Sequence, residues 1–303
     1  MENFNWREYL YCNPDLQQRR VKTENMVIQH YQNFGKNENR VLKRPIVEQN
    51  NNLSEDYTFV ILRCVRSEKQ SDLWIQCYNS IRKYHPKNKI IIIDNNSYSR
   101  YIKNTNLKNC DLINHTDTKS GEILPFYFFL KYKWSKYMIF FHDSMFLNKP
   151  LNANMLKVDK FKLFWHFSSG VHDHKTRIPH LLSYLKDNEV LQQLFLKKKN
   201  WFGAFGLSCT ISLEFLEFIE KKHEFTNLVY YTKNRDDRKC LERILGLLFS
   251  YYDYDAVYNS YFGNVSTCPG FGKNNIQDHK EPVSENVKKW EELFSVSKVF
   301  VCR

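Results

Sequence analysis

Two kinds of apolar pattern alternate along the middle of the chain. Short continuous runs of branched and aromatic residues are typical of strands that are buried on both faces of a sheet. Stretches with apolar residues at helical spacing, such as 69–84, follow some of these runs. This alternation predicts an α/β fold with an open, mostly parallel sheet flanked by helices. The runs predict strands at 59–65, 89–94 and 137–141, and the shorter apolar pattern at 111–115 predicts a weaker third strand.

The second half of the chain is less regular. Residues 161–167 predict another strand, and residues 201–211 form an apolar segment that is interrupted by glycines. Beyond about residue 250, Tyr-, Gly- and Asn-rich stretches predict mainly loops. Helical spacing of the apolar residues predicts helices at 124–134, 178–199, 212–222, 236–249 and 284–295.

The N-terminal residues form a separate pattern. Over 1–44, apolar residues fall at roughly helical intervals, broken by the Asn13-Pro14-Asp15 turn and ended by Gly35. Residues 45–56 are polar and rich in asparagine, as linkers often are. The sequence therefore predicts a small all-α module at 1–44, a linker at 45–56 and a main domain at 57–303.

Composition and charge narrow the class of protein. The 303 residues are 42% hydrophobic and 16% aromatic, which is enough for a sizeable core. The formal charge of +12 predicts an anionic partner, such as nucleic acid, a phosphate-bearing small molecule or a membrane surface. The eight cysteines are scattered singly, which argues against a zinc ribbon or a disulfide scaffold. Without a signal-peptide core or a membrane-spanning apolar stretch, we expect a soluble cytoplasmic protein with reduced thiols.

Three acidic residues stand where a predicted strand or helix meets a loop. Asp94 ends the second strand (IIIDNNS), and Asp143 follows the fourth (YMIFFHDS). Such carboxylates bind nucleotide hydroxyls or divalent cations, but they equally cap the turn that follows them. Asp237 opens a predicted helix, where the helix dipole favours an ionised carboxylate that can accept a proton. The alternative there is simple N-terminal capping with an Arg238–Glu242 pair.

The position of these acids predicts a shared pocket. In open parallel sheets, ligands bind beyond the carboxyl ends of the strands. We therefore expect Asp94 and Asp143 to lie at one site. The chain has no G-x-G-x-x-G after the first strand and no P-loop, which disfavours the usual dinucleotide and nucleoside-triphosphate sites. Basic stretches at 131–136 and 197–199 fit a nucleic-acid surface or, equally, solvated helix faces.

The order of the motifs resembles a known family. FVILRCV, IIIDNNS, YMIFFHDS, WFGAFG and DDRKCLERI, taken in sequence over roughly 57–250, resemble the inverting, family-two-like glycosyltransferases of the GT-A fold. The resemblance implies an enzyme that moves a sugar from a nucleotide-sugar donor to a hydroxyl of a glycan, protein or lipid acceptor. It also implies a GT-A-like sheet and a divalent cation, Mn²⁺ or Mg²⁺, that holds the donor diphosphate.

The resemblance further implies roles for particular residues. The catalytic base corresponds to Asp237, with Glu242 as a rival five residues later, so the resemblance implies that Asp94, Asp143 and Asp237 converge around one pocket. Two departures from the family pattern are that the metal motif reads H-D-S instead of D-x-D and that Asp236 replaces the first Glu of the base motif. The remaining implied positions are Asp94, Arg63, Arg66 and Asp143 for the donor, Asp143 and His142 beside Ser144 for the metal, and Trp201, Gly203 and Gly206 on the acceptor side.

Residues 1–44 resemble a short module that is attached to some glycosyltransferases. The matching positions include Asn13-Pro14-Asp15-Leu16 and, later, His30-Tyr31, Gly35, Glu38 and Arg40. Two alternatives for the whole chain stay open. One is a basic α/β nucleic-acid-binding protein without catalysis, and the other is a degenerate glycosyltransferase-like scaffold that binds neither metal nor donor.

Overall fold

The fold is described from a computed structural model of the whole chain, which divides into two compact units. One unit comprises residues 1–51 and 116–118, and the other comprises 52–115 and 119–303. The predicted linker, apart from Asp56, and most of the predicted helix at 284–295 lie outside the described residues. The structure describes residues 4, 6, 9, 13, 16, 21, 23–38, 40, 56–116, 120–151, 158–170, 172–197, 200–268, 294–299 and 301.

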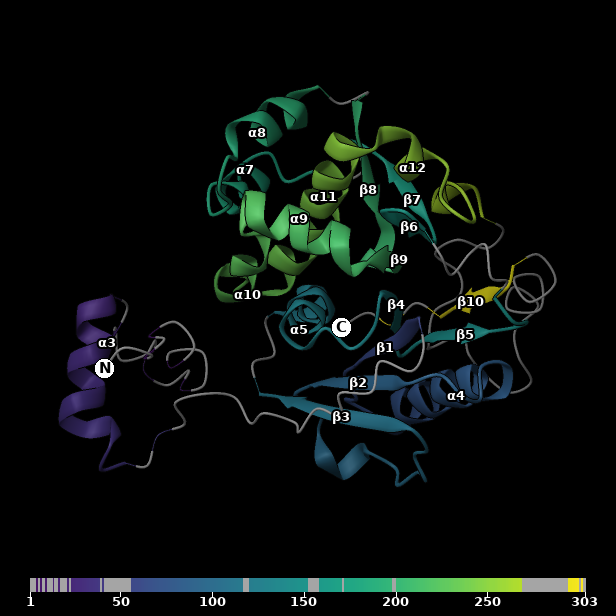
Figure 1. Cartoon of the computed structure of the whole chain (residues 1–303), viewed down its shortest axis with the longest axis horizontal. Coiled ribbons are helices and arrows are strands. Elements are labelled where there is room, and N and C mark those ends of the chain that lie inside the picture. The colour runs from purple at the N-terminus through teal and green to yellow at the C-terminus, as the bar shows by residue number, and fades with distance from the viewer. Residues whose placement is uncertain are drawn as a thin grey trace. The chain divides into compact units, whose positions relative to one another are not determined.

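The larger unit is built on a six-stranded sheet with the order β3-β2-β1-β4-β9-β6 (Figure 1). The first four strands pair in parallel, while β9 and β6 continue the sheet with antiparallel pairing. The predicted α/β class is confirmed, and the sheet is mixed. The strands are β1 (Tyr57–Arg63), β2 (Ile90–Asn95), β3 (Cys110–His115), β4 (Tyr137–His142), β6 (Phe161–Leu163) and β9 (Cys209–Ser212).

Two crossover helices cover opposite faces of this sheet (Figure 1). α4 (Glu68–Tyr84) packs on the face that carries Phe141. α5 (Leu124–Tyr132) lies on the other face, where Phe126 meets Phe140 edge-on. Neighbouring residues of a strand point to opposite faces, so Phe140 and Phe141 belong to different layers of the core. β1, β2 and β4 are thus buried on both sides, as their continuous apolar runs predict, whereas β3 at the edge of the sheet is partly exposed.

The second half departs from the prediction in two places. The single strand expected at 161–167 is two strands, β6 and β7 (His166–Ser168), which belong to different sheets. The single helix expected at 178–199 is two helices, α7 (Arg177–Leu182) and α8 (Glu189–Leu196). Between them Asp187 adopts a left-handed φ of 50°, which a continuous α-helix does not accommodate.

The glycine-interrupted segment at 201–211 folds as strand, turn and strand. β8 (Phe202–Ala204) pairs with β7, the 3₁₀ turn η5 (Phe205–Leu207) follows, and β9 enters the central sheet. β5 (Met145–Leu147) pairs antiparallel with β10 (Val296–Lys298), a pairing that the sequence pattern does not reveal. The remaining elements are α9 (Leu213–His223), α10 (Leu228–Tyr231), α11 (Arg235–Tyr252), α12 (Tyr254–Tyr258), η2 (Ser99–Tyr101), η3 (Gly121–Ile123), η6 (Phe225–Asn227) and η7 (Val265–Thr267).

In the smaller unit, α3 (Glu24–His30) runs directly into the π-helical turn η1 (Tyr31–Gly35). Its buried core contains Tyr9, whose hydroxyl lies 3.2 Å from His30 Nδ1. Gly35 lets this hydroxyl approach closely, because a side chain at that position would collide with it. Several residues of the recognised N-terminal pattern therefore contact one another and hold the unit together.

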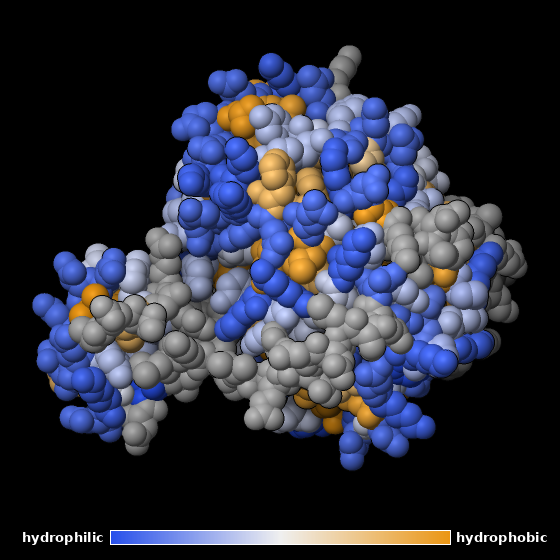
Figure 2. Space-filling view, viewed as in Figure 1, coloured by the Kyte–Doolittle hydropathy of each residue, from blue (hydrophilic) through white to orange (hydrophobic). Residues whose placement is uncertain are grey.

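The exterior of the larger unit is mainly hydrophilic on the face seen in Figure 2, with patches of hydrophobic residues between the polar ones. Among the described residues, every helix is too short or too polar to span a bilayer. The six cysteines that the structure describes are free thiols, five of them buried. Their spacing and their burial agree with the expectation of unpaired cysteines.

Candidate functional site

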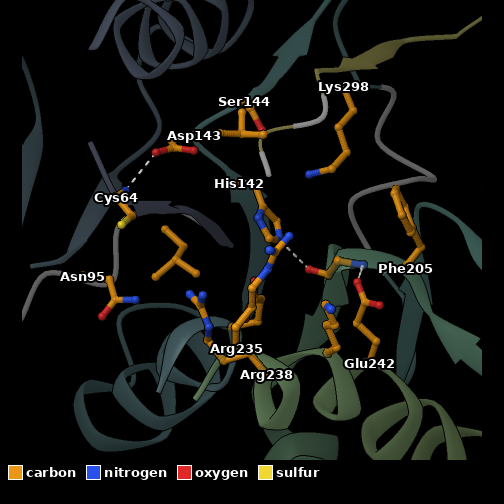
Figure 3. Close-up of a pocket in the computed structure, with 15 residues that line it drawn as sticks. Cys64, Asn95, His142, Asp143, Ser144, Phe205, Arg235, Arg238, Glu242 and Lys298 are labelled. Carbon is orange, nitrogen blue, oxygen red and sulfur yellow. Dashed lines mark hydrogen bonds between the residues drawn. The ribbon is translucent and has the colours of Figure 1, made fainter. Parts of the chain in front are cut away.

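A cavity of about 250 Å³, lined by both polar and apolar residues, opens at the carboxyl ends of the parallel strands (Figure 3). Leu62 and Cys64 line it from the end of β1, Asn95 from β2, and His142 and Asp143 from β4. The opposite wall consists of η5 and the first turns of α11. Strand ends that are distant in sequence meet here because the strands run parallel in one sheet.

The first turns of α11 supply the cavity with charge. The helix begins after Asn234, whose Oδ1 accepts hydrogen bonds from the backbone N–H groups of Asp236 and Asp237. With 3.6 residues per turn, positions three, four and seven apart share one side of the helix. The side that faces the cavity carries Arg235, Arg238, Lys239 and Glu242.

Cations outnumber carboxylates in the described lining. The cations are three residues of α11 together with Lys298, which enters from β10 on another wall (Figure 3). The carboxylates are Glu122, Asp143 and Glu242. Lys298 is only 7% exposed and lies with its ammonium 5.9 Å from the Phe205 ring centroid. The cavity therefore offers an anionic ligand several positive groups around a small volume.

Glu242 is the carboxylate of α11 that faces the cavity. Its Oε1 accepts a hydrogen bond from the Gly206 backbone N–H at 2.8 Å, and its Oε2 lies 2.9 Å from Arg243 Nη1. Burial raises the pKa of Glu242 above 4.5, assisted by the charge of Glu122, while Arg243, the Gly206 N–H and Lys298 act in the opposite direction. A carboxylate oxygen has lone pairs beyond those used here, so Glu242 can still accept a proton from a ligand.

His142 and Asp143 occupy the end of β4, as the sequence predicts. Asp143 is almost completely buried, and its Oδ2 accepts a hydrogen bond from the Cys64 backbone N–H at 2.9 Å. His142 Nε2 lies 2.6 Å from the carbonyl oxygen of Gly206. Because a carbonyl oxygen only accepts hydrogen bonds, this nitrogen carries the proton and donates it.

Gly206 connects the two walls of the cavity. It adopts a left-handed φ of 60°, and a Cβ at this position would lie 3.1 Å from His142 Nε2. Leu207, which is fully buried, follows with a φ of 54°, an uncommon value for a residue with a branched side chain. Backbone in such sparsely populated conformations is enriched at binding and catalytic sites.

Two of the three acids expected to converge do not line the cavity. Asp94 Oδ2 is held 2.6 Å from Arg63 Nε in a buried ion pair, and its Oδ1 accepts from the Ser97 N–H. Asp237 is likewise held, with its Oδ1 2.6 Å from Arg177 Nη1. Of the three, only Asp143 lines the pocket, so the expected convergence is corrected at Asp94 and Asp237.

The other predicted binding residues divide in the same way. Gly206 lines the cavity, but Trp201 is buried in the core and Gly203 packs against the Phe167 ring. Arg66 is close in sequence to Cys64, which lines the cavity, but its guanidinium stacks over Tyr98, with Cζ 4.2 Å from the ring centroid. Arg63, paired with Asp94, also lies 4.8 Å from the Trp74 ring centroid. The acceptor-side segment therefore contributes Phe205 and Gly206 to the site rather than Trp201 and Gly203.

Several residues that line the cavity are not predicted from the sequence. Glu122, Arg235 and Lys298 belong to no motif, and Lys298 joins the site only through the pairing of β10 with β5. Helical geometry distinguishes the two acids of α11. Asp237 and Glu242 are separated by about 140° around a helix and therefore point in different directions. Glu242 and the α11 cations could have been grouped from helical spacing alone.

The described side chains do not form a ready site for a divalent cation. No group of three or more His, Cys, Asp or Glu side chains among the described residues is placed to hold a metal. His142 Nε2 donates to Gly206 O, so only the Nδ1 atom of this ring could ligate an ion. One oxygen of Asp143 already accepts from Cys64. The metal that the H-D-S motif implies would therefore find fewer than three grouped protein ligands among the described residues.

No model of a known protein family matches the sequence, and a comparison with curated proteins finds no significant match. The function must therefore be argued from the geometry of the site itself.

Proposed function

We propose that the chain is a glycosyltransferase that moves a sugar from a nucleotide-sugar donor to a hydroxyl acceptor. The observation that carries the proposal is the cavity at the carboxyl ends of β1, β2 and β4, where the half-buried carboxylate of Glu242 faces a cluster of cations. Transfer with inversion requires these two elements, a base for the acceptor and positive charge near the leaving group.

Glu242 is the base in this proposal. Its carboxylate takes the proton of the acceptor hydroxyl while the hydroxyl oxygen attacks the anomeric carbon. Its raised pKa suits this role, because a general base works best when its pKa approaches the operating pH. The hydrogen bonds from Gly206 and Arg243 fix the orientation of the carboxylate. Asp237, the other candidate, is engaged by Arg177 and does not line the cavity.

The leaving group takes the electrons of the bond that breaks. As the anomeric C–O bond breaks, negative charge develops on the departing nucleoside diphosphate. The cations of α11 and Lys298 line the volume where this charge would appear. Cations already in position stabilise such charge without reorganisation during the reaction.

Buried polar atoms in the cavity also support a hydroxyl-rich ligand. Within the described residues, Asn95 Oδ1 and Glu122 Oε2 are buried and have no hydrogen-bond partner. Buried acceptors in folded proteins are almost always paired, so acceptors that line a cavity accept hydrogen bonds from water or from the donors of a bound ligand. Sugar and ribose hydroxyls are donors of this kind.

A thermal-shift panel tests the proposal. UDP, GDP, CDP and their sugar conjugates are added separately, each with MnCl₂ and with EDTA. At about 100 times its Kd, a ligand stabilises the native state by about 2.7 kcal/mol, which raises the Tm by several degrees. If no nucleotide raises the Tm while a single-stranded oligonucleotide binds with log affinity linear in log salt, the nucleic-acid alternative replaces the proposal.

The pH dependence of transfer tests the base. Glu242 must be ionised to accept a proton, so kcat/KM falls as the pH drops through its pKa. Because that pKa is raised, the acid limb of the profile is expected above pH 4.5, the ordinary value for glutamate. In Glu242→Gln this limb should vanish together with most of the activity. An unchanged limb in that variant assigns the titration to another group.

A further inference from the structure

We propose that Arg238 and Lys298 hold the donor's diphosphate directly, so that the enzyme needs no divalent cation. The inference rests on the proposed function and names the groups that replace the metal. It begins at the end of β4, where the described residues include no group of three or more His, Cys, Asp or Glu side chains placed to hold an ion. The cations that line the same cavity supply the missing positive charge.

The side chain of Arg238 packs against a glycine at a position with no room for a Cβ atom. Gly121, in η3, has a left-handed φ of 51°, and a Cβ there would lie 2.5 Å from Arg238 Cδ. The aliphatic part of Arg238 therefore rests on the backbone of Gly121, and its guanidinium extends toward the cavity (Figure 3). A guanidinium presents several N–H donors in a plane and suits bidentate contacts with phosphate oxygens.

Lys298 reaches the cavity from a different wall. Its strand β10 pairs with β5, which begins two residues after Asp143, and the backbone N–H of Val299 donates to Ser144 O. The side chain is almost completely buried, and its ammonium points into the cavity (Figure 3). Burial strengthens the interaction of this charge with an anion, because the local dielectric is low.

These two cations approach the cavity from separate elements, an arrangement that suits a diphosphate. A diphosphate carries charge on two linked groups, and cations on two walls can engage both of them. A divalent ion would neutralise the same negative charge by binding phosphate oxygens. With Arg238 and Lys298 in these positions, the leaving group is neutralised by the chain itself.

The experiment is calorimetric titration of the EDTA-treated full-length chain with UDP, GDP and CDP, repeated with MnCl₂. We expect the preferred nucleotide to bind in EDTA within about threefold of its affinity in Mn²⁺. Arg238→Gln and Lys298→Met should each weaken binding about ten- to hundredfold, the usual effect of losing a charge-assisted hydrogen bond. Lys222→Gln removes a positive charge from the exposed end of α9 and should leave the affinity within twofold.

The outcomes separate this inference from the proposed function. Nucleotide binding that requires Mn²⁺ overturns the inference and leaves the glycosyltransferase proposal intact. Binding in EDTA that both variants retain also overturns it, since other groups would then hold the diphosphate. Absence of binding in every condition overturns the proposed function, and the inference falls with it. Circular dichroism of each variant confirms that a loss of binding is not a loss of fold.

Discussion

The acidic residues around the cavity fall into two groups that the sequence does not separate. Asp143 and Glu242 line the cavity and accept hydrogen bonds from the backbone N–H groups of Cys64 and Gly206. Asp94 also lies at a strand end of the same sheet, yet it is paired with Arg63 at 2.6 Å. Asp237, on the same helix as Glu242, is paired with Arg177 at 2.6 Å.

The contrast shows that access to the cavity, rather than place on a strand or helix, decides whether an acid can serve a ligand, because Glu242 remains in the cavity lining although it also contacts Arg243 at 2.9 Å. Arg63 and Arg177 hold Asp94 and Asp237 outside the cavity lining, so these two carboxylates serve the fold. A carboxylate held by backbone N–H groups keeps lone pairs for a ligand. Arg63 and Arg177 are distant in sequence from their partners, so this distinction becomes visible only in the folded chain.

The largest expected difference is between Glu242 and Asp237 in the proposed transfer reaction. Removal of a general base lowers the rate by about 10²- to 10⁴-fold, which is the loss we expect in kcat/KM for Glu242→Gln. Asp237→Asn should cost less than about tenfold, because its carboxylate serves the contact with Arg177. Steady-state kinetics with the nucleotide-sugar found in the thermal-shift panel measures both. The reverse order would restore Asp237 as the base.

The next largest effect concerns stability. Asp94→Asn leaves the buried guanidinium of Arg63 without its counter-charge and should lower the free energy of unfolding by about 3–5 kcal/mol. Asp111 is a matched control in the same sheet, since its ion pair with Lys89 is about one-third exposed. Asp111→Asn should cost less than about 1 kcal/mol. Urea denaturation compares the two, and equal losses would contradict a structural role for the Asp94 pair.

A smaller effect is expected where Arg238 rests on Gly121. Gly121→Ala forces a Cβ into the left-handed region and against Arg238 Cδ, with an expected cost of about 1–3 kcal/mol. In an Arg238→Ala background the steric part disappears and only the backbone strain remains. The double-mutant cycle should therefore give a coupling free energy of about 0.5–3 kcal/mol. Additive losses would show that the two residues do not contact each other in solution.

The smallest predicted effect arises at the end of β3, where burial lowers the pKa of His115 to about 3. The unfolded chain takes up this proton near pH 6.5, whereas the folded chain takes it up only near pH 3. Stability should therefore fall as the pH drops below 6.5, by about 1.4 kcal/mol per pH unit from this residue. Chemical denaturation at pH 7.5 and 5.5, with His115→Leu as comparison, measures it. An equal pH dependence in both proteins would assign the loss to other groups.

The sequence predicts the parallel half of the sheet well and the cavity only in part. Continuous apolar runs identify β1 to β4, and their shared direction places Asp143 beside the end of β1. These features depend on local pattern and on the general geometry of parallel sheets. The role of Asp94 could not be predicted from local pattern, because its partner Arg63 lies opposite it on the neighbouring strand β1.

Other parts of the site depend on contacts that carry no local signal. β5 and β10 have three residues each, too few to show a strand period, yet their pairing brings Lys298 to the cavity. Glu122 lies in a short 3₁₀ turn whose position is fixed by packing. The helix expected at 178–199 is interrupted near Asp187, whose left-handed backbone is not evident from apolar spacing.

Gly206 has a consequence for how the site responds as a whole. Its N–H donates a hydrogen bond to the carboxylate of Glu242, and its carbonyl oxygen accepts one from the imidazole of His142. One residue is therefore hydrogen-bonded to both walls of the cavity. Any rearrangement of the Phe205–Leu207 turn alters both hydrogen bonds together. A molecule that displaced this turn would therefore change the ionisation of Glu242 and the orientation of the His142 ring at the same time.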